Sequence, residues 1–174
     1  MKGLIHIYTG DGKGKSTAAI GLTLRCAGSN HDVIYTQFLK NGKSSEINIL
    51  KTIPNIKLFF AEKNFGFLFN ATDEVKAEAK IVYSKLLKTV VEAAIETKPQ
   101  LLVLDEIIAT YNHDLIDKNY LLDFLKNKPE NLEIVMTGRE PSQELIELGD
   151  YVSNIQKIKH PFDKGIPARI GIEK

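Results

Sequence analysis

The chain has 174 residues, is 43% hydrophobic and 26% charged, and carries a formal net charge of +1, a composition typical of a globular domain. A net charge this small gives no bulk attraction to nucleic acid or to a membrane surface, and no apolar stretch approaches the roughly 20 residues that span a bilayer. The lone Cys26 cannot form an internal disulfide, which fits a reducing compartment. We therefore predict one domain over residues 1–174, cytoplasmic, with neither nucleic acid nor a membrane as partner.

Short apolar runs alternate with longer amphipathic segments along the chain. The first half predicts strands at 4–10, 32–39 and 57–62, a helix at 15–28, a short helix capped by Ser44 or Ser45 and ending at Leu50, and an aromatic-rich loop at 64–70. The second half predicts a helix at 73–97 between Thr72 and Pro99, a helix capped by Asp117 and ending at Lys126, a short helix from Ser142, and strands at 101–107, 133–138 and 151–159. This alternation predicts an α/β domain with a mainly parallel sheet flanked by helices, but the strand order cannot be read from it.

A glycine-rich loop joins the first predicted strand to the first predicted helix. Glycine lets the main chain approach an anion closely, and successive N–H groups then converge with the helix N-terminus on phosphate oxygens. The residues expected at the phosphates are Thr9, Gly10, Asp11, Gly12, Lys13, Gly14, Lys15, Ser16 and Thr17. Within this set Lys15 would supply a positive charge and the Ser16 hydroxyl a ligand for Mg²⁺.

The loop departs from the common phosphate-binding pattern G-x-x-x-x-G-K-[ST]. That pattern would place its first glycine at position 9, where this chain has Thr9 and where Gly10 follows one residue late. The loop is therefore effectively shorter, which could seat a phosphate chain differently. The dinucleotide pattern G-x-G-x-x-G would need a third glycine at position 15, and Lys15 excludes it.

Two adjacent acids, Asp105 and Glu106, follow the apolar residues Leu101–Leu104. A phosphate-binding loop needs such an acid as its magnesium partner on a neighbouring strand, and ligands of open α/β sheets bind at the carboxyl edge. Adjacent strand residues point to opposite faces, so we expect one of the two acids to face the metal, without knowing which. The alternative is an acidic helix cap without a metal.

Four stretches carry a resemblance beyond a generic nucleotide binder: YTGDGKGKSTAA, LLVLDEI, MTGR and IKHPFDKGIPARIGIE, in this order. Together they resemble the P-loop family of ATP:cob(I)alamin adenosyltransferases, also called corrinoid adenosyltransferases, from about Leu4 to Glu173. The resemblance implies a RecA-like P-loop domain that transfers the 5′-deoxyadenosyl group of ATP to the Co(I) centre of a corrinoid and releases triphosphate. It further implies Mg²⁺ or Mn²⁺, a homodimer, a reduced flavoprotein as electron donor, and a role in adenosylcobalamin biosynthesis or salvage.

The same resemblance implies roles for residues outside the loop. Phe67 and Phe69 would pack on the lower face of the corrin ring, although Phe69 stands where the family often has tryptophan. Arg25 on the first helix would assist the phosphate end. Arg139, which follows Gly138 at a strand end, is a candidate from its position. The plain alternatives are a core cap for the phenylalanines and a solvent-facing helix position for Arg25.

Two other functions remain open from the residues themselves. A RecA-like ATP-binding module with a conformational or nucleic-acid-linked output would explain the glycine loop and the acids equally well. It would explain neither the C-terminal stretch IKHPFDKGIPARIGIE nor the aromatic-rich loop at 64–70, and it predicts orthophosphate as product. A small-molecule kinase would need an arginine-bearing lid, whereas Arg25, Arg139 and Arg169 are scattered along the chain.

Overall fold

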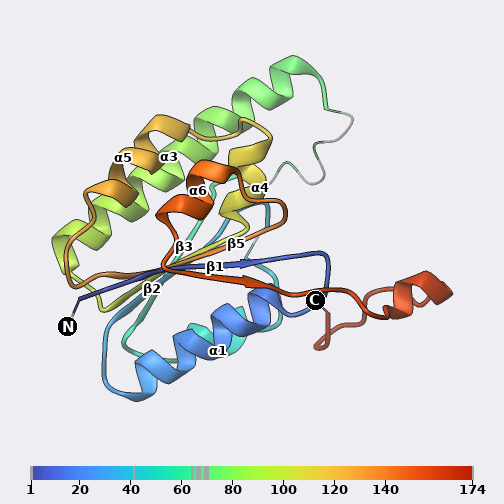
Figure 1. The fold of residues 1–174 in the computed structure, drawn as a ribbon, viewed down its shortest axis with the longest axis horizontal. Coiled ribbons are helices and arrows are strands. Elements are labelled where there is room, and N and C mark those ends of the chain that lie inside the picture. The colour runs from blue at the N-terminus through green and yellow to red at the C-terminus, as the bar shows by residue number, and fades with distance from the viewer. Residues whose placement is uncertain (1, 41, 64, 66–67, 69–70, 174) are drawn as a thin grey trace.

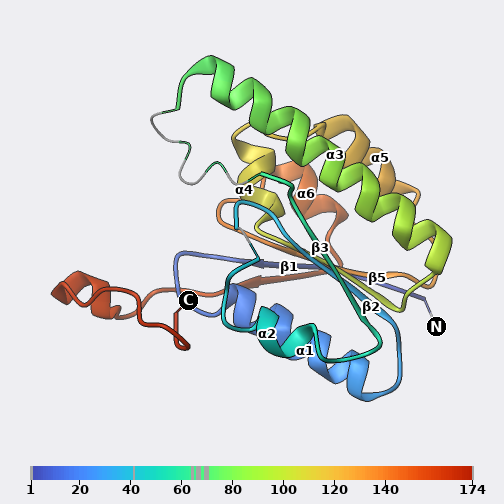
Figure 2. The same cartoon turned by 180° about the vertical axis from the view of Figure 1, so that it is seen from behind.

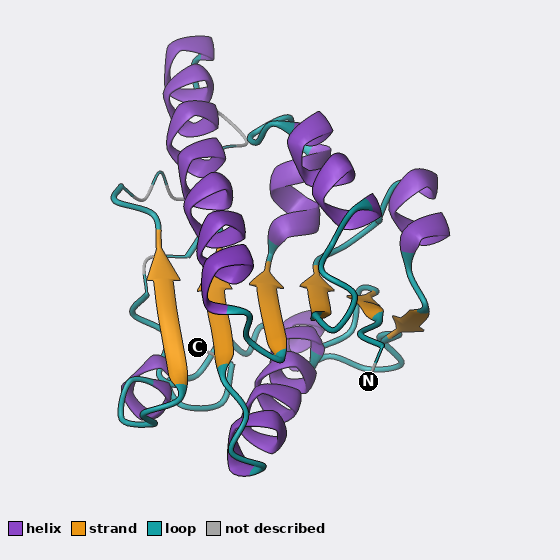
Figure 3. Cartoon of the chain, turned by 90° about the vertical axis from the view of Figure 1, so that its left-hand side faces the viewer, coloured by secondary structure: helices purple, strands orange, loops and turns teal. Residues whose placement is uncertain are grey.

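A computed structural model describes residues 2–40, 42–63, 65, 68 and 71–173. Within these residues six strands form one sheet in the order β3-β2-β4-β5-β1-β6, and every adjacent pair is parallel (Figure 3). The strands are β1 Ile5–Thr9, β2 Val33–Gln37, β3 Ile56–Phe60, β4 Leu101–Asp105, β5 Glu133–Thr137 and β6 Tyr151–Asn154. The predicted α/β class and parallel sheet are confirmed. The strand order places β5 between β1, which leads into the glycine loop, and β4, which ends in the acids, so the expectation that the acids lie on a strand neighbouring the loop strand is wrong.

Helices cover both faces of the sheet, as Figures 1 and 2 show from opposite sides. They are α1 Lys15–Gly28, α2 Ile47–Leu50, α3 Asp73–Thr97, α4 Ile107–Asn112, α5 Lys118–Lys126 and α6 Gln143–Leu148, followed by a short 3-10 helix η1 at Pro161–Lys164. One layer holds α3, α4, α5 and α6, and the opposite layer holds α1 and α2. None of these described helices is both long and apolar enough to cross a membrane.

The two layers bury two separate hydrophobic clusters, and β4 contributes to both. Leu102 and Leu104 pack in the cluster with α3, α4 and α5, while Leu101 and Val103 pack in the cluster with α1 and α2. Side chains of a strand alternate between faces, so Asp105 continues the second set and faces α1. Because of this alternation, the Asp105 carboxylate lies on the same face of the sheet as the first turn of α1.

Two predicted caps are confirmed and one is wrong. Thr72 Oγ1 accepts a hydrogen bond from the Val75 N–H (3.5 Å), and Asp117 Oδ1 accepts one from the Tyr120 N–H (3.0 Å). Each bond satisfies a first-turn N–H that has no partner inside the helix. Helix α2 instead begins after Glu46, which has helical backbone angles and makes no side-chain cap. The expectation of a serine cap fails because the chain is already turning helically at this point.

The strand prediction at 101–107 is two residues too long, and helix α4 was not predicted. Glu106 has a φ of 62°, which is left-handed, and serves as the N-cap residue of α4. Left-handed backbone cannot continue a strand, so the chain leaves the sheet at Asp105 and Ile107 starts a helix. The last strand also ends early, at Asn154 instead of position 159.

Residues 155–173, which we call the tail, leave the sheet beside β6. Figure 1 shows the tail running out to η1 and returning toward the glycine-loop end of α1. It exposes large apolar side chains, with Ile158 90% and Phe162 73% exposed. Its first residues contact the loop backbone, so the tail forms part of the site described next.

Candidate functional site

Three buried polar side chains stand side by side at the carboxyl ends of neighbouring strands. Gln37 of β2 pairs in register with Asp105 of β4, and the register of β4 with β5 brings Thr137 level with them. All three are fully buried. Thr137 Oγ1 donates to Asp105 Oδ1 (2.7 Å), and Gln37 Nε2 lies 3.4 Å from Asp105 Oδ2. Thr137 and Gln37 therefore give the Asp105 carboxylate polar neighbours on both sides within an otherwise apolar layer.

Asp105 also binds two groups from outside the sheet. Ser16, in the first turn of α1, donates its hydroxyl to Asp105 Oδ1 (2.8 Å). Lys40 places its Nζ 2.6 Å from Asp105 Oδ2 and 3.1 Å from Ser16 Oγ. Burial alone would lower the pKa of Lys40, but the charge and hydrogen bond of Asp105 raise it overall. The buried carboxylate is therefore paired and hydrogen-bonded, as a buried charge must be.

The glycine loop is shaped by the tail as well as by its own sequence. The Gly12 N–H donates to Ile155 O (2.8 Å), and Asp11 Oδ1 accepts from the Lys157 N–H (2.9 Å). Gly10 has a φ of +105°, and a Cβ on it would lie 2.3 Å from Ile155 O. Only glycine fits at position 10, because a side chain would meet the backbone of residue 155.

Lys15 curls back over the loop that precedes it. Its Nζ donates to Gly10 O (2.7 Å) and to Gly12 O (2.9 Å). Burial lowers the pKa of Lys15, and the positive charge of Arg139 lowers it further. The ammonium group therefore lies at the centre of the loop, where it can meet an anion that the loop holds.

A cavity of about 320 Å³ opens between the loop and the tail. One wall is polar and consists of residues 11–17 with Lys40, Glu106 and Arg139; the other is formed by the tail residues His160, Pro161, Phe162, Ile166, Pro167, Ala168, Ile172 and Glu173. A volume of this size is within the usual range of small-ligand sites. The cavity can therefore bind a polar chain along one side and an apolar group along the other.

Glu106 contributes to this cavity from the end of β4. Its N–H donates to Thr137 Oγ1 (2.9 Å), which supports the left-handed backbone at this residue. Burial raises the pKa of the Glu106 carboxyl, and the neighbouring charge of Asp105 raises it further. Bringing a cation beside the two carboxylates would relieve that repulsion.

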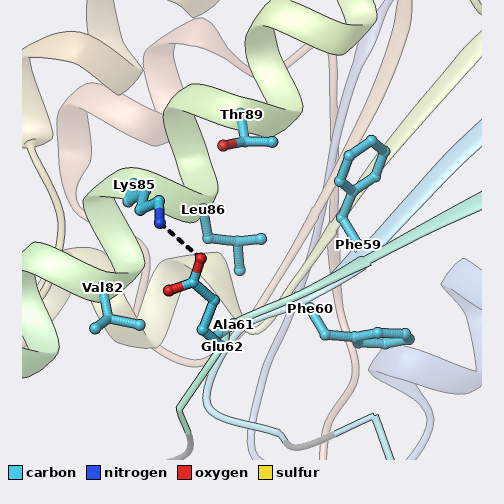
Figure 4. Close-up of a pocket in the computed structure, with 8 residues that line it drawn as sticks. All are labelled: Phe59, Phe60, Ala61, Glu62, Val82, Lys85, Leu86 and Thr89. Carbon is cyan, nitrogen blue, oxygen red and sulfur yellow. Dashed lines mark hydrogen bonds and ion pairs between the residues drawn. The ribbon is translucent and has the colours of Figure 1, made fainter.

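A second, smaller cavity of about 100 Å³ lies between β3 and α3 (Figure 4). Its lining residues are Phe59, Phe60, Ala61, Glu62, Val82, Lys85, Leu86 and Thr89. Lys85 Nζ donates to Glu62 Oε1 (2.6 Å) across its opening, as the dashed line in Figure 4 marks. The cavity is too small for a nucleotide, so the loop–tail cavity is the candidate site.

The structure brings most of the predicted site residues to the loop–tail cavity. Residues lining it are Asp11, Gly12, Lys13, Gly14, Lys15, Ser16, Thr17, Glu106 and Arg139. Thr9 and Gly10 precede this lining, and Asp105 lies behind Ser16. Arg25 is exposed in the last turn of α1, away from the lining, and its role stays a prediction. Phe67 and Phe69 lie outside the described residues, so their role stays a prediction as well.

Sequence reasoning missed Gln37, Lys40 and Thr137. Each lies at, or just beyond, the carboxyl end of a parallel strand. This edge is where open α/β sheets bind their ligands, so polar residues ending apolar strands were a usable signal. The signal was diluted because many strands end in a polar residue for reasons of solubility alone.

Comparison with known proteins identifies a family that matches nearly the whole chain. The family model described as ATP:corrinoid adenosyltransferase BtuR/CobO/CobP matches residues 1–173. A corrinoid adenosyltransferase of Sinorhizobium sp. is 33% identical over 99% of this chain and 80% of its own, and one of Escherichia coli (strain K12) is 27% identical over 99% and 86%.

Solved structures show the fold alone. EssC (ATPases 2 and 3) from Geobacillus thermodenitrificans superposes with a TM-score of 0.55 at 17% identity, covering 98% of this chain. This chain spans only 36% of that EssC chain. The similarity supports an ATPase-like P-loop fold, and the full-length sequence match supplies the family. The chain belongs to the ATP:corrinoid adenosyltransferase family.

Proposed function

We propose that this protein transfers the 5′-deoxyadenosyl group of ATP to the Co(I) centre of a corrinoid and releases triphosphate. The observation that carries the proposal is the two-sided cavity, in which a phosphate-binding loop faces the tail that bears the family motif. The loop suits the polyphosphate chain. The tail wall, which is apolar apart from His160 and Glu173, suits a larger, less polar group beside it.

The loop side accounts for the leaving group. A departing triphosphate develops negative charge, and preorganised N–H groups and cations stabilise such charge most effectively where water is excluded. Lys15 is already held at the centre of the loop by Gly10 O and Gly12 O. Exchanging these two carbonyls for phosphate oxygens would give Lys15 stronger, charge-assisted hydrogen bonds.

We also infer that Mg²⁺ or Mn²⁺ binds beside Ser16. Hydroxyl and carboxylate oxygens are the ligands that Mg²⁺ prefers, usually one or two carboxylates together with substrate phosphates. Among the described residues there is no group of three or more His, Cys, Asp or Glu able to hold a metal, which fits an ion shared with a nucleotide. Ser16 and Glu106 face the cavity, and Asp105 orients Ser16 from behind. The ion would neutralise charge on the phosphates.

The corrinoid is the second substrate in this proposal, with Phe67 and Phe69 as the pair that packs against its lower face. Cobalt itself supplies the nucleophile, so the protein needs no nucleophilic side chain. From the family we further propose a homodimer, a reduced flavoprotein as electron donor and a cytoplasmic location. Phe162, Ile166 and Ile172 of the tail offer apolar surface on the side of the cavity opposite the loop.

Product analysis tests the proposal. The protein is incubated anaerobically with ATP, Mg²⁺ and chemically reduced cobalamin. We expect a light-sensitive alkylcobalamin spectrum and one triphosphate for each cobalamin converted. Orthophosphate formed without Co(I), and no alkylcobalamin, would show an ATPase module instead.

A further inference from the structure

Lys40 contacts Ser16 Oγ, the hydroxyl oxygen that the proposed metal ion needs, and the Asp105 carboxylate that orients it. Its Nζ contacts Ser16 Oγ at 3.1 Å and Asp105 Oδ2 at 2.6 Å, while its side chain is 29% exposed and that of Asp105 fully buried. Among the ion pairs of the described residues, the Lys40–Asp105 pair has the most buried carboxylate. Lys40 also lines the loop–tail cavity.

The backbone after β2 is built to deliver Lys40 to this position. The Phe38 N–H donates to Asp105 O (2.8 Å), which ties the end of β2 to the end of β4. Leu39 then takes a φ of +57°, a left-handed conformation that is uncommon for residues other than glycine. This turn brings Lys40 back over the strand ends. A flexible surface lysine would need neither the tie nor the turn.

A divalent ion at Ser16 and the observed position of Lys40 disfavour one another. Mg²⁺ bonds oxygen at about 2.1 Å, so an ion on Ser16 Oγ would lie within about 5 Å of the Lys40 Nζ observed there. Two cations this close repel strongly in a partly buried site. The ion therefore binds more weakly while Lys40 stays in place, and more tightly once the lysine moves.

We infer that the Lys40 ammonium competes with the metal ion for the position at Ser16. Through this competition Lys40 makes metal binding depend on bound nucleotide. Without a polyphosphate, the displaced ammonium gives up the fully buried Asp105, and Glu106, the carboxylate that also lines the cavity, is one that the metal itself needs. When ATP binds, its phosphates offer an anionic partner inside the cavity, so Lys40 can turn to them while the metal takes Ser16. Metal and ATP then favour each other's binding, because such coupling is reciprocal. The inference rests on the metal position proposed above but not on the group that is transferred.

Metal binding to the nucleotide-free protein tests this directly. Mn²⁺ is titrated into the full chain and free Mn²⁺ is followed by electron paramagnetic resonance. We expect Lys40→Met to bind Mn²⁺ at least about tenfold more tightly than the unaltered protein, which corresponds to about 1.4 kcal/mol. We also expect ATP to strengthen Mn²⁺ binding less in Lys40→Met than in the unaltered protein. Lys88→Met is the matched control, because Lys88 is an exposed lysine on α3, in the other helix layer.

Thermal melting gives a second readout that does not depend on activity. Lys40→Met leaves Asp105 without its cation, so it should melt lower without metal and gain more from added Mn²⁺ than the unaltered protein. Should Lys40→Met fail to fold, Lys40→Gln, which can still donate a hydrogen bond to Asp105, takes its place in both measurements. Unchanged or weaker Mn²⁺ binding in the Lys40 variant would overturn the inference and leave Lys40 a structural ion pair.

Asp105→Asn separates the two ways in which the reasoning can fail. If the metal position is right, this variant binds Mn²⁺ with ATP more weakly than the unaltered protein. If its Mn²⁺–ATP binding is unchanged, the metal lies elsewhere and both the position and the role of Lys40 are wrong. If Asp105→Asn weakens binding while Lys40→Met has no effect on nucleotide-free Mn²⁺ binding, the metal position stands and only the competitor role is wrong.

Discussion

Thr137→Val removes a hydroxyl that serves both acids of the site. Thr137 Oγ1 donates to Asp105 Oδ1 (2.7 Å) and accepts from the Glu106 N–H (2.9 Å), and the threonine is fully buried. A hydrogen bond to a charged group contributes about 1.5–3 kcal/mol, and a buried N–H without a partner costs about 1–3 kcal/mol. Valine has nearly the same shape and adds a little apolar burial. We expect the free energy of unfolding to fall by about 3 kcal/mol.

Urea denaturation followed by circular dichroism measures this change. In a domain of this size a loss of about 3 kcal/mol lowers the melting temperature by about 6–12 °C. Thr137→Ser is the matched control, since it keeps the hydroxyl and deletes one buried methyl group, at a cost of about 1 kcal/mol.

Two results would refute the reasoning about Thr137. A loss below about 1 kcal/mol in Thr137→Val would mean that water or another group replaces the hydroxyl at little cost. An equal loss in both variants would mean that methyl packing, and not hydrogen bonding, holds the strand ends together. Either outcome would remove the argument that Thr137 supports the left-handed turn at Glu106.

Further predictions concern the loop, a helix glycine and one exposed carboxylate. Lys15→Met should weaken ATP binding by about 10- to 100-fold in calorimetry, because a charge-assisted hydrogen bond contributes about 1.5–3 kcal/mol; unchanged affinity would contradict its place at the phosphates. Gly21→Ala should stabilise α1 by about 0.5–1 kcal/mol in urea, since a Cβ there meets nothing within 4 Å. In the same assay Gly12→Ala should destabilise by about 1–3 kcal/mol, because its Cβ would lie 2.7 Å from a tail carbonyl. A hydrogen bond from Lys80 lowers the pKa of the Asp114 carboxyl, so the stability it gives is present above its unfolded pKa and is lost as pH falls through the lower folded value. Asp114→Asn should therefore lower the free energy of unfolding by less than about 1 kcal/mol at pH 7, as for other exposed ion pairs, and by still less near pH 2. A loss that grows as the pH falls would contradict the predicted pH dependence.

The glycine loop, the helix caps, the long helix and the strands were predictable because each depends on residues close together in the sequence. The loop Gly10–Thr17 combines glycines, a lysine and hydroxyls at fixed spacing, and the chemistry of an anion site needs these types in that order. The caps at Thr72 and Asp117 are visible because one side chain bonds an N–H three residues on. The long helix and the buried strands follow from apolar spacing alone.

Other features depend on pairs of segments far apart in sequence. Glu106 was expected to continue a strand, and its left-handed turn depends on a bond to Thr137, 31 residues away. The wall of the cavity opposite the loop comes from the tail, whose own sequence shows no period. Contacts of this kind leave no local pattern to read.

The sequence by itself therefore determined that a phosphate-binding loop and an acidic strand end exist, and to which family they belong. Only the tertiary structure decided the order β3-β2-β4-β5-β1-β6, and with it the meeting of Ser16, Lys40 and Thr137 around Asp105. The physical reason is that buried parallel strands are all short apolar runs, so their patterns do not distinguish one neighbour from another. Their order depends instead on how α1 to α6 pack on the two faces, which is a property of the whole chain.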